Sequence, residues 1–167
     1  MITQARLKYL FDYDPEVGDF VRKVKVASNA KVGDIAGCSH NNGYISIGID
    51  KKLYLAHRLA WLYMTGSFPK EMTDHINHIR HDNRFCNLRE ATNAQNARYS
   101  YPRKNNTSGR KGVSLLRKKY VAEVKYNGKK VYLGLFDNIE EASAAYEAKA
   151  KELFGEFYLR NEESPAS

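Results

Sequence analysis

A polar segment in the middle of the chain decides how the fold is interpreted. It runs from Thr73 to Asn96 and reads TDHINHIRHDNRFCNLREATNAQN. Asn, His, Asp and Arg crowd this segment and apolar residues are few, which is typical of a loop or a site rather than of a core. We therefore expect a chemical site inside an otherwise foldable domain.

Three side chains of this segment have the chemistry that phosphodiester hydrolysis requires. Asp74 offers a carboxylate oxygen and Asn96 an amide oxygen, both of which suit Mg²⁺ or Mn²⁺. His75 can accept a proton near neutral pH, because the pKa of an unperturbed histidine is about 6.5. The segment therefore predicts one divalent cation per active site, held by Asp74 and Asn96, with His75 as the general base.

The segment resembles the HNH nuclease motif, in the version of phage and intron homing endonucleases in which the third motif position is Asn. The resemblance rests on the pair Asp74-His75, on residues 82–84, 87–89 and 91–96, and upstream on residues 13–18 and 57–61. It covers roughly residues 7–98. It implies a ββα-metal fold over about residues 57–98, in which a hairpin carries the Asp-His pair and a following helix carries the last metal ligand. It also implies that Asn87 braces the loop and orients His75.

Other residues of the segment leave alternatives open. Arg84 and Arg89 are equally suited to clamping a phosphate and to bracing the loop. Three histidines followed by a cysteine could suggest a zinc cluster, which we consider the weaker idea because the spacing suits no zinc knuckle. These residues are His75, His78, His81 and Cys86. No structural zinc is expected, and Cys38 and Cys86 are interpreted as two ordinary buried or half-buried thiols.

The residues before this segment alternate between strand and turn signals. The first 56 residues predict short strands and turns, with a hairpin at 13–20 and another around Asp50-Lys51-Lys52. Apolar residues then recur at spacings of three and four from His57 to Thr65, which predicts a short helix that Gly66 ends. We assign residues 1–98 to one nuclease domain.

Positive charge is concentrated beyond this domain. The chain of 167 residues has 27 Lys and Arg against 19 Asp and Glu, a net charge of +8. Residues 98–130 alone carry eleven basic side chains and one acidic one, a net charge of +10. Such a basic stripe indicates a polyanionic partner, nucleic acid first and an anionic membrane second. Residues 99–109 are rich in turn formers and predict a basic linker.

The last part of the chain predicts a second small domain at residues 110–161, followed by a tail at 162–167. Strand-like runs at 112–116, 120–126 and 131–136 surround the hairpin turn Asn127-Gly128-Lys129. Asn138 and Glu141 form a capping box for a helix that ends near Gly155. The expected fold class is therefore α+β, with a three-stranded antiparallel sheet and one packed helix in this domain.

Residues 107–161 resemble the three-stranded DNA-binding domain of plant ethylene-response factors, which also occurs in HNH homing endonucleases. The resemblance rests on Ser108-Gly109, on residues 120–124 and 131–134, and on Ala145-Tyr146. That family lays its sheet in the major groove. The positions that would contact DNA are Lys111, Lys125, Lys130 and Tyr132, with Arg117 and Lys119 in the first turn. Ser114 and Leu116 stand where plant members present arginines, so the plant target sequence should not transfer.

Together these features predict a site-selective, metal-dependent DNA endonuclease of the homing type. Its partner would be double-stranded DNA, and it would act as a monomer or as a dimer induced by DNA. No apolar run approaches the 18 to 20 residues or so that span a bilayer, and no signal peptide is recognisable, so we expect an intracellular protein of a bacterial or phage-infected cell. The alternatives are a non-catalytic DNA-binding regulator on a nuclease-like scaffold, and a structure- or RNA-directed nuclease.

Overall fold

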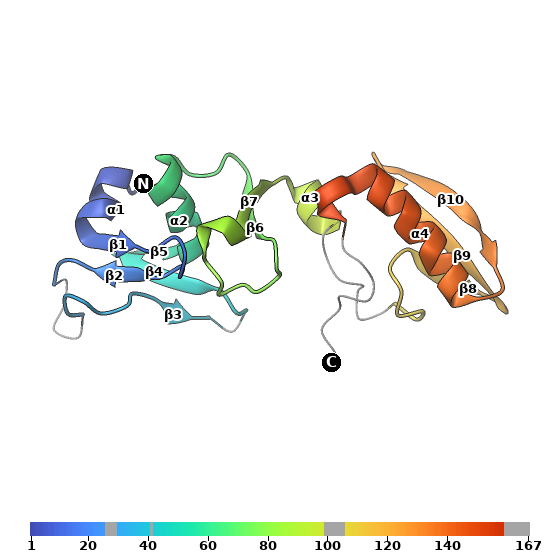
Figure 1. Cartoon of the computed structure of the whole chain (residues 1–167), viewed down its shortest axis with the longest axis horizontal. Helices are drawn as coiled ribbons and strands as arrows, with labels where there is room; N and C mark the ends of the chain where they lie inside the picture. Colours follow the sequence, from blue (N-terminus) through green and yellow to red (C-terminus); the bar gives the residue numbers. More distant parts are fainter. Residues whose placement is uncertain (26–29, 41, 99–105, 159–167) are drawn as a thin grey trace. The chain divides into compact units, whose positions relative to one another are not determined.

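The computed structural model of the chain describes residues 1–25, 30–40, 42–98 and 106–158. The chain divides into two compact units, Met1–Asn93 and Ala94–Ser167, which are described separately (Figure 1). Most of the predicted linker (99–105) and the whole predicted tail (162–167) lie outside the described residues. No helix within the described ranges is both long enough and apolar enough to cross a membrane.

The first unit combines helices with three small antiparallel sheets. The elements, in chain order, are α1 (Gln4–Leu10), β1 (Phe11–Tyr13), β2 (Phe20–Arg22), β3 (Cys38–Ser39), β4 (Ile45–Ile49), β5 (Lys52–Leu55), α2 (Ala56–Thr65), β6 (Met72–His75), the short 3₁₀ helix η1 (Phe85–Asn87) and β7 (Leu88–Ala91). The sheets pair β1 with β2, β3 with β4 and β5, and β6 with β7. This mixture of small sheets and helices agrees with the expected α+β class.

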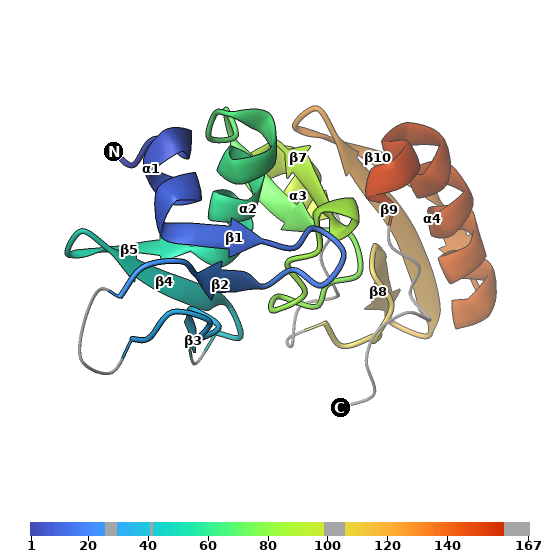
Figure 2. The same cartoon turned by 60° about the vertical axis from the view of Figure 1, so that its left-hand side comes forward.

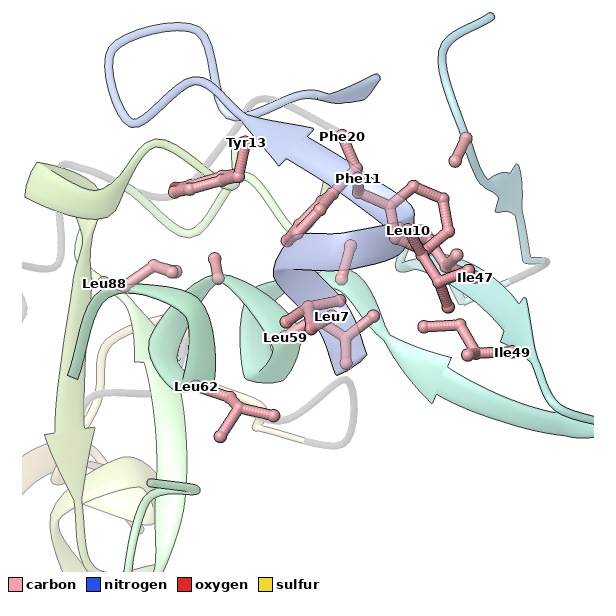
Figure 3. Packing of buried hydrophobic residues seen from close by; sticks show 13 residues of the cluster. Leu7, Leu10, Phe11, Tyr13, Phe20, Ile47, Ile49, Leu59, Leu62 and Leu88 are labelled. Carbon is pink, nitrogen blue, oxygen red and sulfur yellow. The ribbon is translucent and has the colours of Figure 1, made fainter. Parts of the chain in front are cut away.

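The core of this unit forms between α1, α2 and the first two sheets. Leu7 of α1 and Leu59 of α2 are completely buried and lie next to each other, as Figure 3 shows. Phe11 and Phe20 of the β1–β2 hairpin pack edge to face, with ring centroids 6.1 Å apart. Burial of such side chains is the main stabilising contribution in a small domain. This core therefore supports the polar segment at residues 73–96.

The predicted elements of this unit are mostly present, but one helix is missing from the prediction. The helix expected from His57 to Thr65 is α2, and Gly66 ends it in the left-handed conformation with φ +85°. Residues 4–10 were included among the strands and turns, whereas they form α1. Thr3 caps this helix by accepting a hydrogen bond from the amide of Arg6, and Leu7 and Leu10 are its buried positions. The prediction was wrong there because a single pair of buried positions in seven residues gives no clear periodicity.

The two cysteines also differ from the prediction. Cys38 and Cys86 are both free thiols, and both are exposed rather than buried or half-buried. Cys38 begins β3, an edge strand of only two residues, and Cys86 lies in η1. Neither position faces the core of the unit, which explains the exposure.

The second unit contains a sheet with a helix packed on one face (Figures 1 and 2). Its elements are α3 (Asn93–Arg98), β8 (Val113–Leu116), β9 (Lys119–Tyr126), β10 (Lys129–Phe136), α4 (Ile139–Phe154) and η2 (Gly155–Phe157). The strand order is β10-β9-β8, and both pairs are antiparallel. Asn127 and Gly128 have φ values of +48° and +79°, as a tight two-residue hairpin requires.

The helix α4 presents one stripe of residues to the sheet. Ala142, Tyr146 and Ala150 recur every fourth residue and are buried against Val113 and Val124. Asn138 caps this helix, but its side chain accepts the amide of Glu140 and not that of Glu141, so the cap differs from the expected capping box. The small alanines let the helix lie close to the strands.

Among the described glycines of this unit, Gly112 has the least space for a side chain. Its φ is +72°, and a Cβ atom placed on it would lie 2.0 Å and 2.1 Å from ring carbons of Tyr146. Gly109 has a similar φ of +68°, but a Cβ there would meet nothing within 4 Å. The two positions therefore separate the effect of backbone strain from the effect of lost space.

We predict that Gly112→Ala destabilises the second unit by about 2–4 kcal/mol, because it adds overpacking to backbone strain. Gly109→Ala should cost only about 1 kcal/mol, because it adds strain alone. Both variants are compared with the wild type in urea unfolding of the full chain by circular dichroism. The single tryptophan, Trp61, lies in the first unit, so its fluorescence transition should not move. Equal effects of the two substitutions would contradict this interpretation of Gly112.

Candidate active site

The hairpin of β6 and β7 places the candidate catalytic residues. The strands pair antiparallel, with Asp74 opposite Arg89 and His75 opposite Leu88. Residues 76–87 connect the strands, so His75 is the last strand residue before the loop. Thr73, Asp74 and His75 are all buried, although each has a polar side chain. Buried polar groups need partners, and the partners of Asp74 and His75 define the site.

Arg89 holds the carboxylate of Asp74. Its Nη2 and Nε atoms donate to Oδ2 of Asp74 at 2.9 Å and 3.0 Å. Both side chains are nearly buried, with exposures of 12% for Arg89 and 10% for Asp74. Both bonds end on Oδ2, and no described residue donates a hydrogen bond to Oδ1, so this oxygen can take another ligand. Of the two roles expected for Arg89, this geometry favours that of a brace.

His75 lies in a pocket of rings and amides. Its ring centroid is 5.0 Å from that of His57 and 5.9 Å from that of Tyr44. Its Nε2 lies 3.5 Å from Oδ1 of Asn83, whose own Nδ2 donates to the backbone oxygen of His81 at 3.1 Å. Burial lowers the pKa of His75 below its ordinary value, and this outweighs the opposing hydrogen bond to Asn83. The imidazole is therefore neutral at neutral pH, as a general base must be.

His57 is a second buried histidine beside the first. It is 4% exposed and is the second residue of α2, with its ring centroid 5.2 Å from that of Tyr44. Burial, with smaller contributions from His75 and Arg58, lowers the pKa of His57 to about 3. Its Nδ1 is buried and makes no hydrogen bond to the described residues. Two neutral imidazoles thus pack edge to face, and a charge on either is unfavourable.

Asn87 closes the loop at its base. Its Oδ1 accepts the amide of Asn77 at 2.9 Å, and its Nδ2 donates to Oδ1 of Asn77 and to the backbone oxygen of Asp82, both at 2.9 Å. Its backbone oxygen also accepts the amide of Ile76 at 2.9 Å. These four bonds connect both sides of the loop. The contacts fit the bracing expected of Asn87, while the side-chain partner of His75 is Asn83.

A second set of bonds fixes the outer part of the loop. Arg84 donates to Asp82 through Nε at 2.8 Å and through Nη2 at 2.6 Å, and Asn77 donates to the same carboxylate at 2.6 Å. The hydrogen bond from Arg84 is the largest of the effects that lower the pKa of Asp82 to about 2. The Arg84 side chain is still 46% exposed. It therefore braces the loop and also presents a guanidinium group to solvent.

The turn between β1 and β2 supports the loop from the side of the core. The hydroxyl of Tyr13 donates to the backbone oxygen of Asn83 at 2.6 Å, and the amide of Phe85 donates to the backbone oxygen of Pro15 at 2.9 Å. A Cβ on Gly18 would lie 2.6 Å from the backbone nitrogen of Arg84, and its φ is +91°. Only glycine fits this approach. The turn thereby holds Asn83, and through it His75.

The two expected metal ligands belong to different units. Asp74 lies in the first unit, and Asn96 lies on α3, half-buried, in the second. Within the described ranges, no group of three or more His, Cys, Asp and Glu residues is placed to hold a metal ion. One carboxylate oxygen and one amide oxygen nevertheless suit Mg²⁺, which commonly keeps waters and binds through one or two carboxylates and a phosphate. The donor chemistry therefore fits a divalent cation.

The comparison with protein families bears directly on this hairpin. Residues 54–98 match the family described as HNH endonuclease. This segment is therefore similar to an HNH endonuclease domain. The match begins in β5 and contains α2, the β6–β7 hairpin and α3.

A second comparison concerns individual proteins rather than families. The chain is similar to an uncharacterised HNH endonuclease of Acanthamoeba polyphaga mimivirus. The two are 34% identical over 112 residues, which is 66% of this chain and 58% of that protein. The chain thus spans less than two thirds of the length of this relative. No solved structure matches the chain significantly.

The segment that matches this family contains candidate site residues that the sequence alone did not reveal. His57 was noted only as the start of the expected helix, but its ring packs directly on His75. Asn83 was noted only as part of a motif, and it is the side-chain neighbour of His75. No local pattern indicates either contact, because both depend on how the loop folds onto α2. His81 and Cys86 are exposed, unlike His75, which does not favour a zinc cluster of these residues.

The candidate DNA contacts of the second unit do not all lie on one surface. Lys125, Lys130, Lys119 and Tyr132 lie on strands and are exposed, and Arg117 lies in the turn between β8 and β9. Lys130 pairs with Glu123 at 2.8 Å and Lys119 pairs with Asp137 at 2.9 Å. Lys111 is half-buried instead. Burial lowers its pKa to about 8, and it lines a groove with Val124, Tyr146 and Phe154.

The buried His57 predicts a loss of stability in mild acid. Above pH 6.5 or so the residue is neutral in both the folded and the unfolded state. Below that pH the unfolded chain binds a proton that the folded chain does not, because the folded pKa is about 3. The free energy of unfolding should therefore fall by up to about 2 kcal/mol between pH 6.5 and 5.

The measurement is urea unfolding of the full chain at pH 7 and pH 5, followed by Trp61 fluorescence. His57→Leu should be less sensitive to this change of pH than the wild type, whatever its stability at pH 7. His40→Leu is the matched control, because His40 is an exposed histidine of the same unit and its loss should leave the dependence on pH unchanged. An unaltered acid sensitivity in His57→Leu would rule the explanation out.

Proposed function

We propose that this protein is a divalent-metal-dependent, site-selective DNA endonuclease of the homing type. Its HNH domain would hydrolyse the phosphodiester bond, and its second unit would hold the target DNA. The observation that carries the proposal is the buried Asp74-His75 pair at the end of β6, with a neutral imidazole beside a carboxylate that Arg89 orients. The match of residues 54–98 to the HNH endonuclease family and the named relative support the reaction class.

In the proposed reaction, His75 takes a proton from a water molecule that attacks the scissile phosphorus. The bond from phosphorus to the leaving sugar oxygen breaks, and this oxygen takes up a proton from solvent. Asn83 positions the base, since an amide oxygen can only accept a hydrogen bond. The contact with Oδ1 of Asn83 therefore favours the tautomer with the proton on Nε2, which leaves Nδ1 as the atom that accepts the proton.

Asp74 and Asn96 would bind the cation. When bound, a divalent cation stabilises the negative charge that develops on the phosphate and the leaving oxygen. Arg89 contributes by holding Oδ2 of Asp74, so that Oδ1 has a fixed direction. Arg84 is an exposed arginine of the loop and would bind a phosphate next to the cut. The ion is Mg²⁺ or Mn²⁺ in this proposal.

The second unit would bind double-stranded DNA through its sheet, placed in the major groove. Three observations support this role. The basic residues are concentrated in residues 98–130, the face opposite α4 is open, and Lys125, Lys130 and Tyr132 are exposed there. The major groove is also wide enough to admit two strands of a sheet. The protein would act as a monomer or as a DNA-induced dimer.

The test of the catalytic role is the variant His75→Ala. We expect it to lower cleavage by a factor of at least 10²–10⁴, as loss of a general base does, while binding of DNA persists. The substrate is a plasmid library of genomic fragments, incubated with Mg²⁺ or with a chelator, and the chelator should abolish cutting by the wild type. His81→Ala is the control, because His81 is an exposed histidine of the same loop. Wild-type cleavage by His75→Ala would refute the assignment.

The test of the binding role is the variant Lys125→Ala. If Lys125 contacts one phosphate, the slope of log affinity against log salt should become shallower by about 0.9, and affinity should fall for all sequences. Lys151→Ala is the matched control, since Lys151 is an exposed lysine of the same unit on α4. Binding of the full chain to duplex DNA is measured without divalent metal at several salt concentrations. Equal slopes for the two variants would contradict DNA binding by the sheet.

A further inference from the structure

The sheet of the second unit has two chemically different faces. On β9, Tyr120, Ala122 and Val124 pack towards α4, and Ala122 and Val124 are buried. The residues between them point the other way, because side chains alternate along a strand. Residues directly opposite each other on paired strands share a face. The register of the three strands therefore assigns every position to the α4 face or to the open face.

A β-bulge in β10 keeps Tyr132 and Leu135 on the same face of the sheet. Tyr132 is opposite Glu123, and Leu135 is opposite Val121, so both belong to the open face although they are three residues apart. The ladder shifts between Tyr132 and Gly134, and the extra residue, Leu133, packs against the core. Without this extra residue, strict alternation would put one of the two side chains on the α4 face.

The open face carries a strip of apolar side chains. On β8, Ser114 is opposite Val121 and Leu116 is opposite Lys119, so both belong to this face. We define the apolar strip as Leu116, Val121, Tyr132 and Leu135. Leu116 is 55% exposed, Tyr132 61% and Leu135 47%. Leucines and a tyrosine exposed together on one sheet face indicate a binding surface.

Charge identifies the partner that fits this strip. Lys119, Lys125 and Lys130 lie on the same face, and Glu123 is its acidic residue. The adjoining turn between β8 and β9 adds Arg117 and Lys118 at one end. An apolar strip between basic residues complements a surface that is apolar in its middle and anionic at its edges. The major groove of DNA is such a surface where thymine displays its C5-methyl group between two phosphate backbones.

We propose that the apolar strip recognises thymine methyl groups in the major groove. Leucine and valine side chains cannot hydrogen-bond to base edges, and the thymine methyl is the apolar group that the groove presents. The inference rests on the proposed function and adds the source of its selectivity. The preferred target is therefore a duplex with thymines where Leu116, Val121 and Leu135 meet the bases, and the lysines bind the flanking phosphates.

The experiment compares thymine with deoxyuridine, which lacks only the methyl group. Duplexes with a randomised central region are made with thymine, and the full chain selects its preferred sequences in buffer without divalent metal. The selected duplexes are then made again with deoxyuridine in place of thymine, and both forms are titrated. Affinity should fall about fourfold for each methyl contact that is lost.

Variants show whether the protein itself reads the methyl group. Leu116→Ser and Leu135→Thr should bring the ratio of the two affinities towards one. Leu115→Ser is the matched control, since Leu115 is 54% exposed on the same strand but is opposite Tyr120, on the α4 face. It should keep the wild-type ratio. All three side chains are about half exposed, so these substitutions leave the core in place.

The possible outcomes separate this inference from the proposed function. Equal binding of the thymine and deoxyuridine duplexes, with Lys125→Ala still weakening binding, would overturn the methyl inference alone. A ratio that is the same in Leu116→Ser and in the wild type would assign the effect to DNA shape and would also overturn it. If neither Lys125→Ala nor loss of the methyl group changes the affinity for duplex DNA, the sheet does not bind DNA and both proposals fail. In that case the oligomeric state of the chain and its binding to anionic vesicles are measured, to show whether a second copy or a membrane surface covers the strip.

Discussion

The ion pair between Asp74 and Arg89 is the constraint on which the site depends. The pair lies directly across the β6–β7 hairpin and is almost buried, so a slip of the strands by one residue would leave a buried charge without its partner. The register in turn puts His75 at the last strand position and Asn87 just before β7. Each loop residue then has a fixed distance to the hairpin. The pair thus fixes where Asp74, His75 and the loop lie relative to one another.

The loop is held together by hydrogen bonds between its own polar groups. Asn87 joins Asn77 to Asp82, and Asp82 accepts from Arg84, so residues 76–87 form a closed network without an apolar core of their own. The aromatic surface beneath it is supplied by distant segments. Trp61 of α2 packs on Phe85 with ring centroids 5.7 Å apart, and Tyr13 holds Asn83. The first 65 residues thus serve as the scaffold of the hairpin.

The sequence predicted what local patterns determine and failed where tertiary contacts decide. The helix α2, the turn at Asp50 and the strands of the second unit follow from periodicity and turn residues, and they are present. The helix α1 was missed because its two buried leucines fall only three residues apart in a seven-residue helix. The contacts of His75 with His57 and with Asn83 could not be predicted, because tertiary packing brings these parts of the chain together. The partner of Arg89 became evident only once the strand register was known.

The bulge at Leu133 has a consequence for how such a protein can evolve. It lets the two faces of β10 each keep their own set of residues. Val131 and Leu133 pack against the core, whereas Tyr132 and Leu135 are exposed on the open face. Substitutions at the open positions therefore carry little folding penalty. During evolution these residues can be substituted one at a time, without a compensating substitution in the core. The side chains on the open face of this sheet can therefore change faster in evolution than the fold of the sheet.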